Sequence, residues 1–215
     1  MKHNKELMRQ PIQTENGAVH IKLLVKYYPE SVEDELVLPN TQNLFYLQLK
    51  HDVITGRLRV AEPEAAVLLA SYHIQAQLGD IDQLDDFPPD LGNGQSWEQH
   101  MLERVKQLQP ILPDYVVHSN PGMTPDNWHA EVFKAQQDLR GLSVEESKLE
   151  YVKLCAKIIN FGVIYFLIKV GKDFETSIDH WIGISSYGIN LYSTEDKLNP
   201  KKNWAWTQVD DLNYK

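Results

Sequence analysis

The pattern of apolar and polar positions divides the chain into a helical part and a β part. Between residues 31 and 160 apolar side chains recur at the spacing of amphipathic helices. After Gly162 they gather in short aromatic and β-branched runs separated by turn-forming residues, which is typical of strands. The pattern therefore predicts an α+β protein in which a helical bundle precedes an antiparallel β meander.

The most apolar stretch, residues 64–80, has no charged side chain between its first and last residues. It is too short and too often interrupted by polar side chains to cross a bilayer, which takes about 20 apolar residues. At helical spacing only a narrow stripe, Glu64, Ser71 and Gln75, remains for solvent. Pro63 and Gly79 punctuate the two ends. We expect a helix buried inside the bundle, with no reactive role.

Capping residues and helix breakers define the other helices. Ser143 and Glu146 form a capping box, Thr124 precedes a proline at a helix start, and Ser31 and Asp34 have the spacing of a weaker box. A loop is expected around Pro110, Pro113 and Pro121. The expected helices lie before Pro39 and over residues 41–56, 63–78, 97–109, 124–141 and 143–162.

Two sets of strands are expected. Residues 18–28 alternate between apolar and polar positions, but no neighbouring segment offers a partner, so this strand either belongs to a missing sheet or docks on another element. The β part contains runs at residues 163–170, 180–184, 188–192 and 206–214. Four strands without a covering helix leave an open sheet with one exposed face.

The net charge and the number of cysteines make some classes of partner and cellular location less favourable. The 215 residues carry a net charge of −9, which argues against nucleic acid as a partner because phosphate binding needs clustered Lys and Arg. Residues 80–99 hold six acidic side chains and no basic one, and we interpret them as a solvated loop. A single cysteine and the absence of an apolar N-terminal leader favour a cytoplasmic protein that is not transmembrane.

No catalytic or metal-binding motif stands out. The eight histidines are scattered, and no HExxH, GxSxG or phosphate-loop pattern is present. Cys155 lies on an expected helix face without a histidine at a recognisable spacing, which favours a buried structural thiol. Trp204 and Trp206 are expected to pack on the sheet. We therefore expect neither an enzyme, nor a metal site, nor a cofactor.

Several strings resemble the FERM domain, and within it the ezrin, radixin, moesin and merlin branch of the band 4.1 superfamily. They are "KYYPE", "TQNLFYLQLK", "PEAAVLLASYHIQAQLGD", "LEYVKLCAKIINFGVIYFLIK", "WIGISSYGINLY" and "LNPKKNWAW", in the family's order. The resemblance implies a ubiquitin-like first lobe, a second lobe like an acyl-CoA-binding protein, and a third lobe like a pleckstrin-homology or phosphotyrosine-binding domain.

Compared with a complete FERM domain, the chain is expected to be truncated at both ends. Residues 1–18 match nothing, 19–28 correspond to the last strand of the first lobe, 29–160 to the second lobe and 161–215 to an incomplete third lobe. Residues 80–121 exceed the usual loop length by more than ten residues.

The resemblance also implies a function. Such domains are non-catalytic adaptors at the cytoplasmic face of the plasma membrane, where they link cytoplasmic tails of membrane proteins or phosphoinositides to the cortical cytoskeleton through regions not found in this chain. The family's tail-peptide groove maps onto Val209, Leu212 and Tyr214. Lys201 and Lys202 are candidates for contact with anionic lipid.

Two alternatives remain open. The helical lobe is a candidate carrier of acyl-CoA or another lipid, although residues 29–100 offer few cations for the CoA phosphates. The other alternative is a fragment without an independent function.

Overall fold

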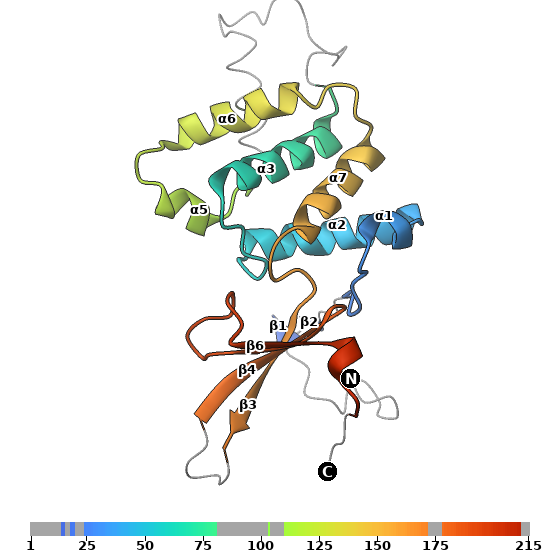
Figure 1. The fold of residues 1–215 in the computed structure, drawn as a ribbon. Coiled ribbons are helices and arrows are strands. Elements are labelled where there is room, and N and C mark those ends of the chain that lie inside the picture. Colours follow the sequence, from blue (N-terminus) through green and yellow to red (C-terminus); the bar gives the residue numbers. More distant parts are fainter. Residues whose placement is uncertain are drawn as a thin grey trace, which may run out of the picture.

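A helical lobe and a β lobe make up the computed structural model of the chain (Figure 1). The structure describes residues 14–15, 18–19, 24–80, 103, 110–171 and 178–211. The lobes are joined by the segment that follows the last helix, and the order of helices then strands confirms the predicted α+β class.

The helical lobe contains six described helices. They are α1 (Val32–Glu35), α2 (Pro39–Ile54), α3 (Pro63–Leu78), α5 (Asp114–Ser119), α6 (Pro125–Gln137) and α7 (Val144–Ala156). Helix α3 packs against both α6 and α7, and α2 packs against α7. Helix α3 is thus the centre of the bundle.

The predicted burial of α3 is confirmed, and of its expected polar stripe Glu64 is exposed, but the prediction is wrong for Ser71 and Gln75. Ile74 is fully buried, and Ser71 and Gln75 are also completely inaccessible to solvent. Ser71 donates to the carbonyl of Val132 at 3.1 Å, and Gln75 accepts from the amide of Gln136 at 2.5 Å. Polar side chains that look solvent-facing on one helix are buried here because α6 supplies hydrogen-bond partners.

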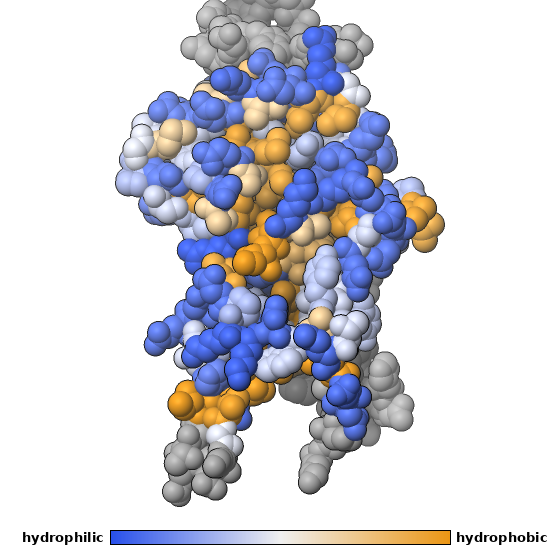
Figure 2. All heavy atoms as spheres, viewed as in Figure 1, coloured by the Kyte–Doolittle hydropathy of each residue, from blue (hydrophilic) through white to orange (hydrophobic). Residues whose placement is uncertain are grey.

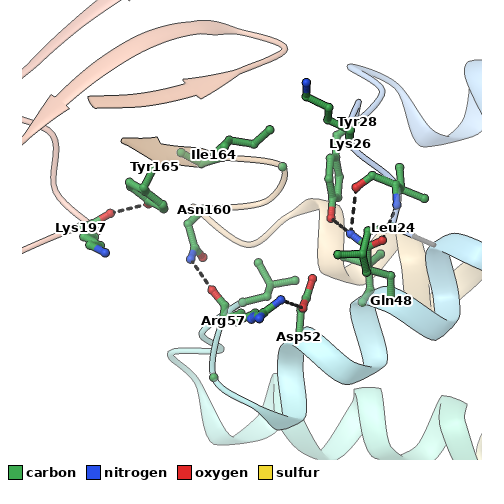
Figure 3. Close-up of a pocket in the computed structure, with 16 residues that line it drawn as sticks. Leu24, Lys26, Tyr28, Gln48, Asp52, Arg57, Asn160, Ile164, Tyr165 and Lys197 are labelled. Atoms are coloured by element: carbon green, nitrogen blue, oxygen red, sulfur yellow. Dashed lines mark hydrogen bonds and ion pairs between the residues drawn. The ribbon is translucent and has the colours of Figure 1, made fainter. Parts of the chain in front are cut away.

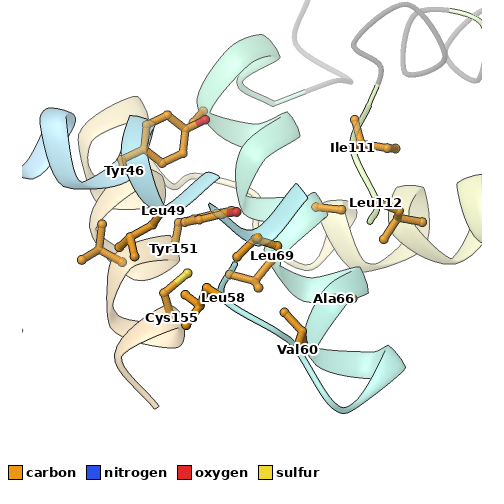
Figure 4. Close-up of a cluster of buried hydrophobic side chains, with 14 of the residues drawn as sticks. Tyr46, Leu49, Leu58, Val60, Ala66, Leu69, Ile111, Leu112, Tyr151 and Cys155 are labelled. Carbon is orange, nitrogen blue, oxygen red and sulfur yellow. The ribbon is translucent and has the colours of Figure 1, made fainter. Parts of the chain in front are cut away.

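The core of the helical lobe fills the space between these helices (Figure 4). Tyr46 and Tyr151 meet edge to face with their ring centroids 5.3 Å apart, a favourable aromatic geometry. Cys155 lies among them, completely buried. Other members of the cluster are Leu49, Leu58, Val60, Ala66, Leu69, Ile111 and Leu112.

Local sequence explains where the helices start. Ser143 and Glu146 form the predicted capping box of α7, and Thr124 caps α6. The short helix expected before Pro39 is found as α1, and Pro39 itself occupies the first turn of α2, where its missing N–H costs no hydrogen bond. Helix α5 was expected as loop, because six residues between prolines give too little periodicity to recognise.

The β lobe is one antiparallel sheet in the order β3 (Ile164–Val170), β4 (Ile178–Ser185), β5 (Gly188–Tyr192) and β6 (Lys202–Ala205). The register places Ile164, Ile184, Ile189 and Trp204 in one row across all four strands. Phe166 and Leu167, on opposite faces of β3, are 50% and 55% exposed. The sheet is therefore open, as expected.

The fourth strand differs from the prediction. Residues 206–214 were expected to be β, but β6 precedes them and Trp206–Gln208 form a 3₁₀ turn. The Trp206 indole N–H donates to the carbonyl of Ser185 at 3.1 Å, which holds this turn against the β4–β5 corner. Residues 212–214 lie outside the described residues, as does the helix expected over residues 97–109 apart from Glu103.

The strand expected over residues 18–28 is not found as a single element. Ala18–Val19 (β2) pairs with Thr14–Glu15 (β1), and residues 24–29 have irregular backbone. Gln48 on α2 satisfies both backbone groups of Val25, accepting from its N–H at 2.6 Å and donating to its carbonyl at 3.1 Å. Docking on a helix, one of the two explanations left open, therefore describes residues 24–28, whereas the expectation that no neighbouring segment offers a strand partner is wrong for Ala18–Val19.

Candidate functional site

A cleft of about 690 Å³ lies where the helical lobe, the N-terminal segment and the β lobe meet (Figure 3). Residues 24–28 form one wall and the start of β3 forms another, and the end of α2 with the loop after it closes the base. We call this cleft the lobe-junction cleft. Three parts of the chain that are distant in sequence contribute to it.

The N-terminal wall is fixed by aromatic packing. The Tyr28 ring meets Phe45 and Phe161 edge to face, at centroid distances of 5.5 and 5.0 Å. Its hydroxyl accepts a 2.7 Å hydrogen bond from Gln48, and burial raises the pKa of Tyr28. Gly162 adopts φ +67°, and a Cβ there would lie 2.7 Å from Tyr28 Cβ, so only glycine allows this approach.

Polar groups line the base of the cleft. Arg57 pairs with Asp52 at 3.7 Å, while burial raises the pKa of the Asp52 carboxyl against the opposing effect of Arg57. Asn160 donates to the carbonyl of Arg57 at 3.2 Å. Its side-chain oxygen is buried and accepts no hydrogen bond from the described residues. The base thus joins the loop after α2 to the segment leading into β3.

The β wall presents an aromatic pair and a lysine. The Tyr165 hydroxyl donates to the carbonyl of Lys197 at 2.8 Å, and its ring packs against Tyr192. The Lys197 ammonium lies 3.5 Å from the centroid of the Trp181 ring, a cation–π contact. Burial raises the pKa of Tyr165, with Tyr192 adding to the effect. These groups suit hydrogen bonding and apolar contact rather than proton transfer.

The residues of the cleft were missed by sequence reasoning. Tyr28 and Gln48 lie in stretches that were interpreted as strand and helix faces, and Gly162 was interpreted only as a boundary. The one available signal was Gly162, which lies where the helical pattern changes to the β pattern, because a glycine permits a close approach of another segment.

The sequence-predicted binding residues lie at the far edge of the β lobe. Lys201 and Lys202 are exposed at the start of β6, and Val209 is half-buried just after the 3₁₀ turn. Leu212 and Tyr214 lie outside the described residues. Strand β6 pairs only with β5 among the described strands, which leaves its other edge unpaired there.

The side chains of His73 and Cys155 are buried in the helical lobe, where their surroundings do not favour reactivity. The His73 ring nitrogen is 2.5 Å from the Tyr46 hydroxyl, and burial lowers the pKa of His73 to about 4. Burial also raises the pKa of the Cys155 thiol strongly, which suppresses the reactive thiolate. Within the described ranges no three His, Cys, Asp or Glu side chains converge as metal ligands.

Among the described helices, none has the length and hydropathy that crossing a bilayer requires.

Comparisons with known families and proteins match both lobes. Residues 31–166 match the FERM central domain and residues 175–215 match the FERM C-terminal PH-like domain. Proteins named moesin/ezrin/radixin homolog 1 from Aedes aegypti and Culex quinquefasciatus are each 30% identical over 210 residues. The match covers 98% of this chain but 32% and 33% of those two proteins, so the chain spans a minor part of their length.

Solved structures agree with the two-lobe arrangement. The FERM and C-terminal domain complex of Drosophila Merlin aligns with a TM-score of 0.77 and 27% identity, over 100% of this chain and 65% of that one. A MyTH4-FERM domain of Dictyostelium discoideum myosin VII aligns with a TM-score of 0.66, over 94% of this chain and 37% of that one. At 16% identity, the myosin structure supports the fold alone.

Proposed function

The chain belongs to the FERM family, and from that premise we propose that it is a non-catalytic adaptor module that binds cytoplasmic tails of membrane proteins. The observation that carries the proposal is the likeness to the Merlin FERM structure over the full length of the chain, together with relatives named for moesin, ezrin and radixin. In this proposal the module works at the cytoplasmic face of the plasma membrane, and its link to the cytoskeleton is made through regions beyond this chain.

The proposed tail-binding site is the outer edge of the β lobe at Val209, Leu212 and Tyr214. An unpaired strand edge offers main-chain hydrogen bonds to an added peptide strand, and apolar side chains beside it offer pockets. Support comes from the edge of β6, which has no partner among the described strands, and from the half-buried side chain of Val209 close to it.

Titration with a basic juxtamembrane peptide tests this site. We expect Val209→Asp to weaken binding at least tenfold, because the carboxylate replaces an apolar contact. Val144→Asp is the control, since Val144 is exposed on the helical lobe, away from β6. Melting curves of both variants report folding. Equal affinities of wild type and a folded Val209→Asp protein would remove the groove from the proposal.

Lys201 and Lys202 are the proposed contacts to phosphoinositide headgroups. Two cations near an anionic surface contribute about 1 kcal/mol each, so binding will be weak for a chain with net charge −9. Sedimentation with vesicles containing phosphatidylinositol bisphosphate is expected to lose most bound protein when both lysines are changed to glutamate. Unchanged sedimentation would exclude this contact.

A further inference from the structure

A second concave surface lies on the helical lobe. Two adjoining hollows, of about 400 and 170 Å³, share Arg59, Val60, Ala61 and Ile159. They run from the start of α3 past the end of α7 to Leu198 in the loop before β6. We call this surface the Ile159 groove. Figure 2 shows hydrophobic residues down the middle of the helical lobe, over α3 and the end of α7, with hydrophilic residues on both sides.

The floor of the groove is apolar and firmly built. Val60 and Leu69 belong to the buried core, and Leu154 and Ile158 are half-buried and pack against it. Ile159 is 66% exposed although it borders both hollows. An exposed aliphatic side chain between two apolar hollows on a rigid floor is the arrangement that a docking surface uses.

Positive charge borders this apolar floor. Arg59 and Lys157 are both exposed, and no carboxylate of the described residues pairs with either. The Arg59 guanidinium lies 5.1 Å from the centroid of the Tyr115 ring, which holds it at the rim. Among the described residues that line the groove, Glu62 is the one with an acidic side chain.

The start of α3 lies beside these two cations. Glu62 is the N-cap of the helix, but its carboxylate accepts no hydrogen bond from the first turn. Pro63 contributes no N–H, and Glu64 in the first turn offsets the partial positive charge of the helix N-terminus, so the positive potential of the groove comes from Arg59 and Lys157. The groove is locally positive on a chain whose net charge is −9.

From this combination we infer that the Ile159 groove docks a short amphipathic peptide segment that carries aliphatic and acidic side chains. The aliphatic side chains enter the hollows beside Ile159, and the acidic ones face Arg59 and Lys157, as in helix-in-groove recognition. The inference goes beyond the proposed tail-binding edge, because the groove is formed mainly by the helical lobe and shares no residue with that edge.

The sign of the peptide charge gives a sharp test. Two 16-residue peptides carry leucine at i, i+3 and i+7 with either glutamate or lysine at the flanking positions, and alanine and glutamine elsewhere. Long-range attraction to a chain of net charge −9 favours the lysine peptide. We expect the glutamate peptide to bind at least tenfold more tightly in a calorimetric titration. The reverse order would overturn the inference.

Two variants test whether the peptide binds in the Ile159 groove. Ile159→Asp and Lys157→Glu are each expected to weaken glutamate-peptide binding at least tenfold. Val37→Asp is the matched control, because Val37 is 70% exposed, like Ile159, but lies between α1 and α2 and lines neither hollow. Its affinity is expected to stay within twofold of wild type.

Melting temperatures confirm that the variants fold. Equal binding by folded Ile159→Asp and Val37→Asp proteins would contradict the inference. Saturation of the groove by laurate with no binding of either peptide would likewise overturn it, and would assign the surface to a fatty acid.

Discussion

Single polar residues inside the helical lobe are buried in matched pairs. His73 faces Tyr46, and Gln75 faces Gln136, with each pair spanning two helices. Burying a polar group without a partner costs about 1–3 kcal/mol, so each residue depends on the other. The two pairs therefore constrain how α3 sits against α2 and α6.

The His73 pair predicts acid sensitivity. The pKa of His73 is lowered from 6.5 to about 4, first by burial and then by Lys50, so the unfolded chain takes up this proton at a higher pH than the folded chain. Stability that is complete above pH 6.5 is therefore lost as the pH falls towards 4, by up to about 3 kcal/mol.

Urea unfolding between pH 7 and pH 4 measures the contribution of His73. His73→Gln keeps an acceptor for Tyr46 but does not titrate, so it is expected to lose less stability over this range than the wild type. Parallel curves for the two proteins would show that His73 is not the group responsible.

For single residues, the sequence predicted which apolar side chains are buried more accurately than which polar side chains are buried. Ile74 and Cys155 were expected inside and are inside. Ser71 and Gln75 were expected in solvent because a helix considered alone assigns polar side chains to its wet face. Their burial depends on groups of α6 and the α6–α7 turn, more than 60 positions away in sequence, which periodicity does not detect.

Among the secondary-structure elements, the β5–β6 pair depends on one glycine. Gly188 has φ +147°, and a Cβ there would collide with the backbone of Trp204 on the neighbouring strand. Backbone atoms paired in a sheet cannot move aside as a flexible side chain does.

We predict that Gly188→Ala destabilises the β lobe by about 2–4 kcal/mol and detaches β6. Faster amide hydrogen exchange at Asn203 and Trp204 would report the detachment. Gly122→Ala is the control, since a Cβ at Gly122 meets no atom within 4 Å and the change should stay within about 0.5 kcal/mol. Retained protection in the Gly188 variant would contradict the prediction.

Helices and strands that are long enough to show a clear apolar pattern were predicted well. The capped helices α6 and α7 and the strands β3, β4 and β5 all lie where the pattern placed them. Helix α5 and the 3₁₀ turn at Trp206–Gln208 were not found, because each is too short to show a period. The misplaced fourth strand has the same origin, since β6 has only four residues.

At the scale of the whole molecule, Gln48 connects the N-terminal segment to the helical lobe. One side chain makes hydrogen bonds to both backbone groups of Val25 and to the Tyr28 hydroxyl. Tyr28 in turn packs against Phe161 and Gly162 at the passage to the β lobe. The side chains of Gln48 and Tyr28 thus connect the N-terminal segment, the helical lobe and the start of the β lobe.

Gln48→Leu is expected to release the N-terminal segment while the helical lobe stays folded. The Val25 amide loses its acceptor, so the free energy of its local opening should fall by about 1–3 kcal/mol. Hydrogen exchange of that amide provides the measurement. Gln137→Leu, at an exposed position of α6, is the control. Equal protection of Val25 in both variants would show that Gln48 does not hold the segment.

Family membership was predictable from strings of sequence, and the lobe-junction cleft was not. Each string is one continuous run of residues, so it can be recognised without knowledge of the fold. The cleft arises from Tyr28, Gln48 and Tyr165, which are brought together only when the lobes and the N-terminal segment assemble. Neither local periodicity nor charge carries that information.

The carboxylate of Asp80 accepts hydrogen bonds from Gln75 and from the backbone N–H of Gly141, so the C-terminal end of α3 is tied to the α6–α7 turn before residue 81 is reached. The bundle is therefore closed at a point that does not depend on how many residues follow. Asp80→Ala removes both of these hydrogen bonds and should therefore loosen the contact between α3 and the α6–α7 turn, which a lower melting temperature of the helical lobe would report.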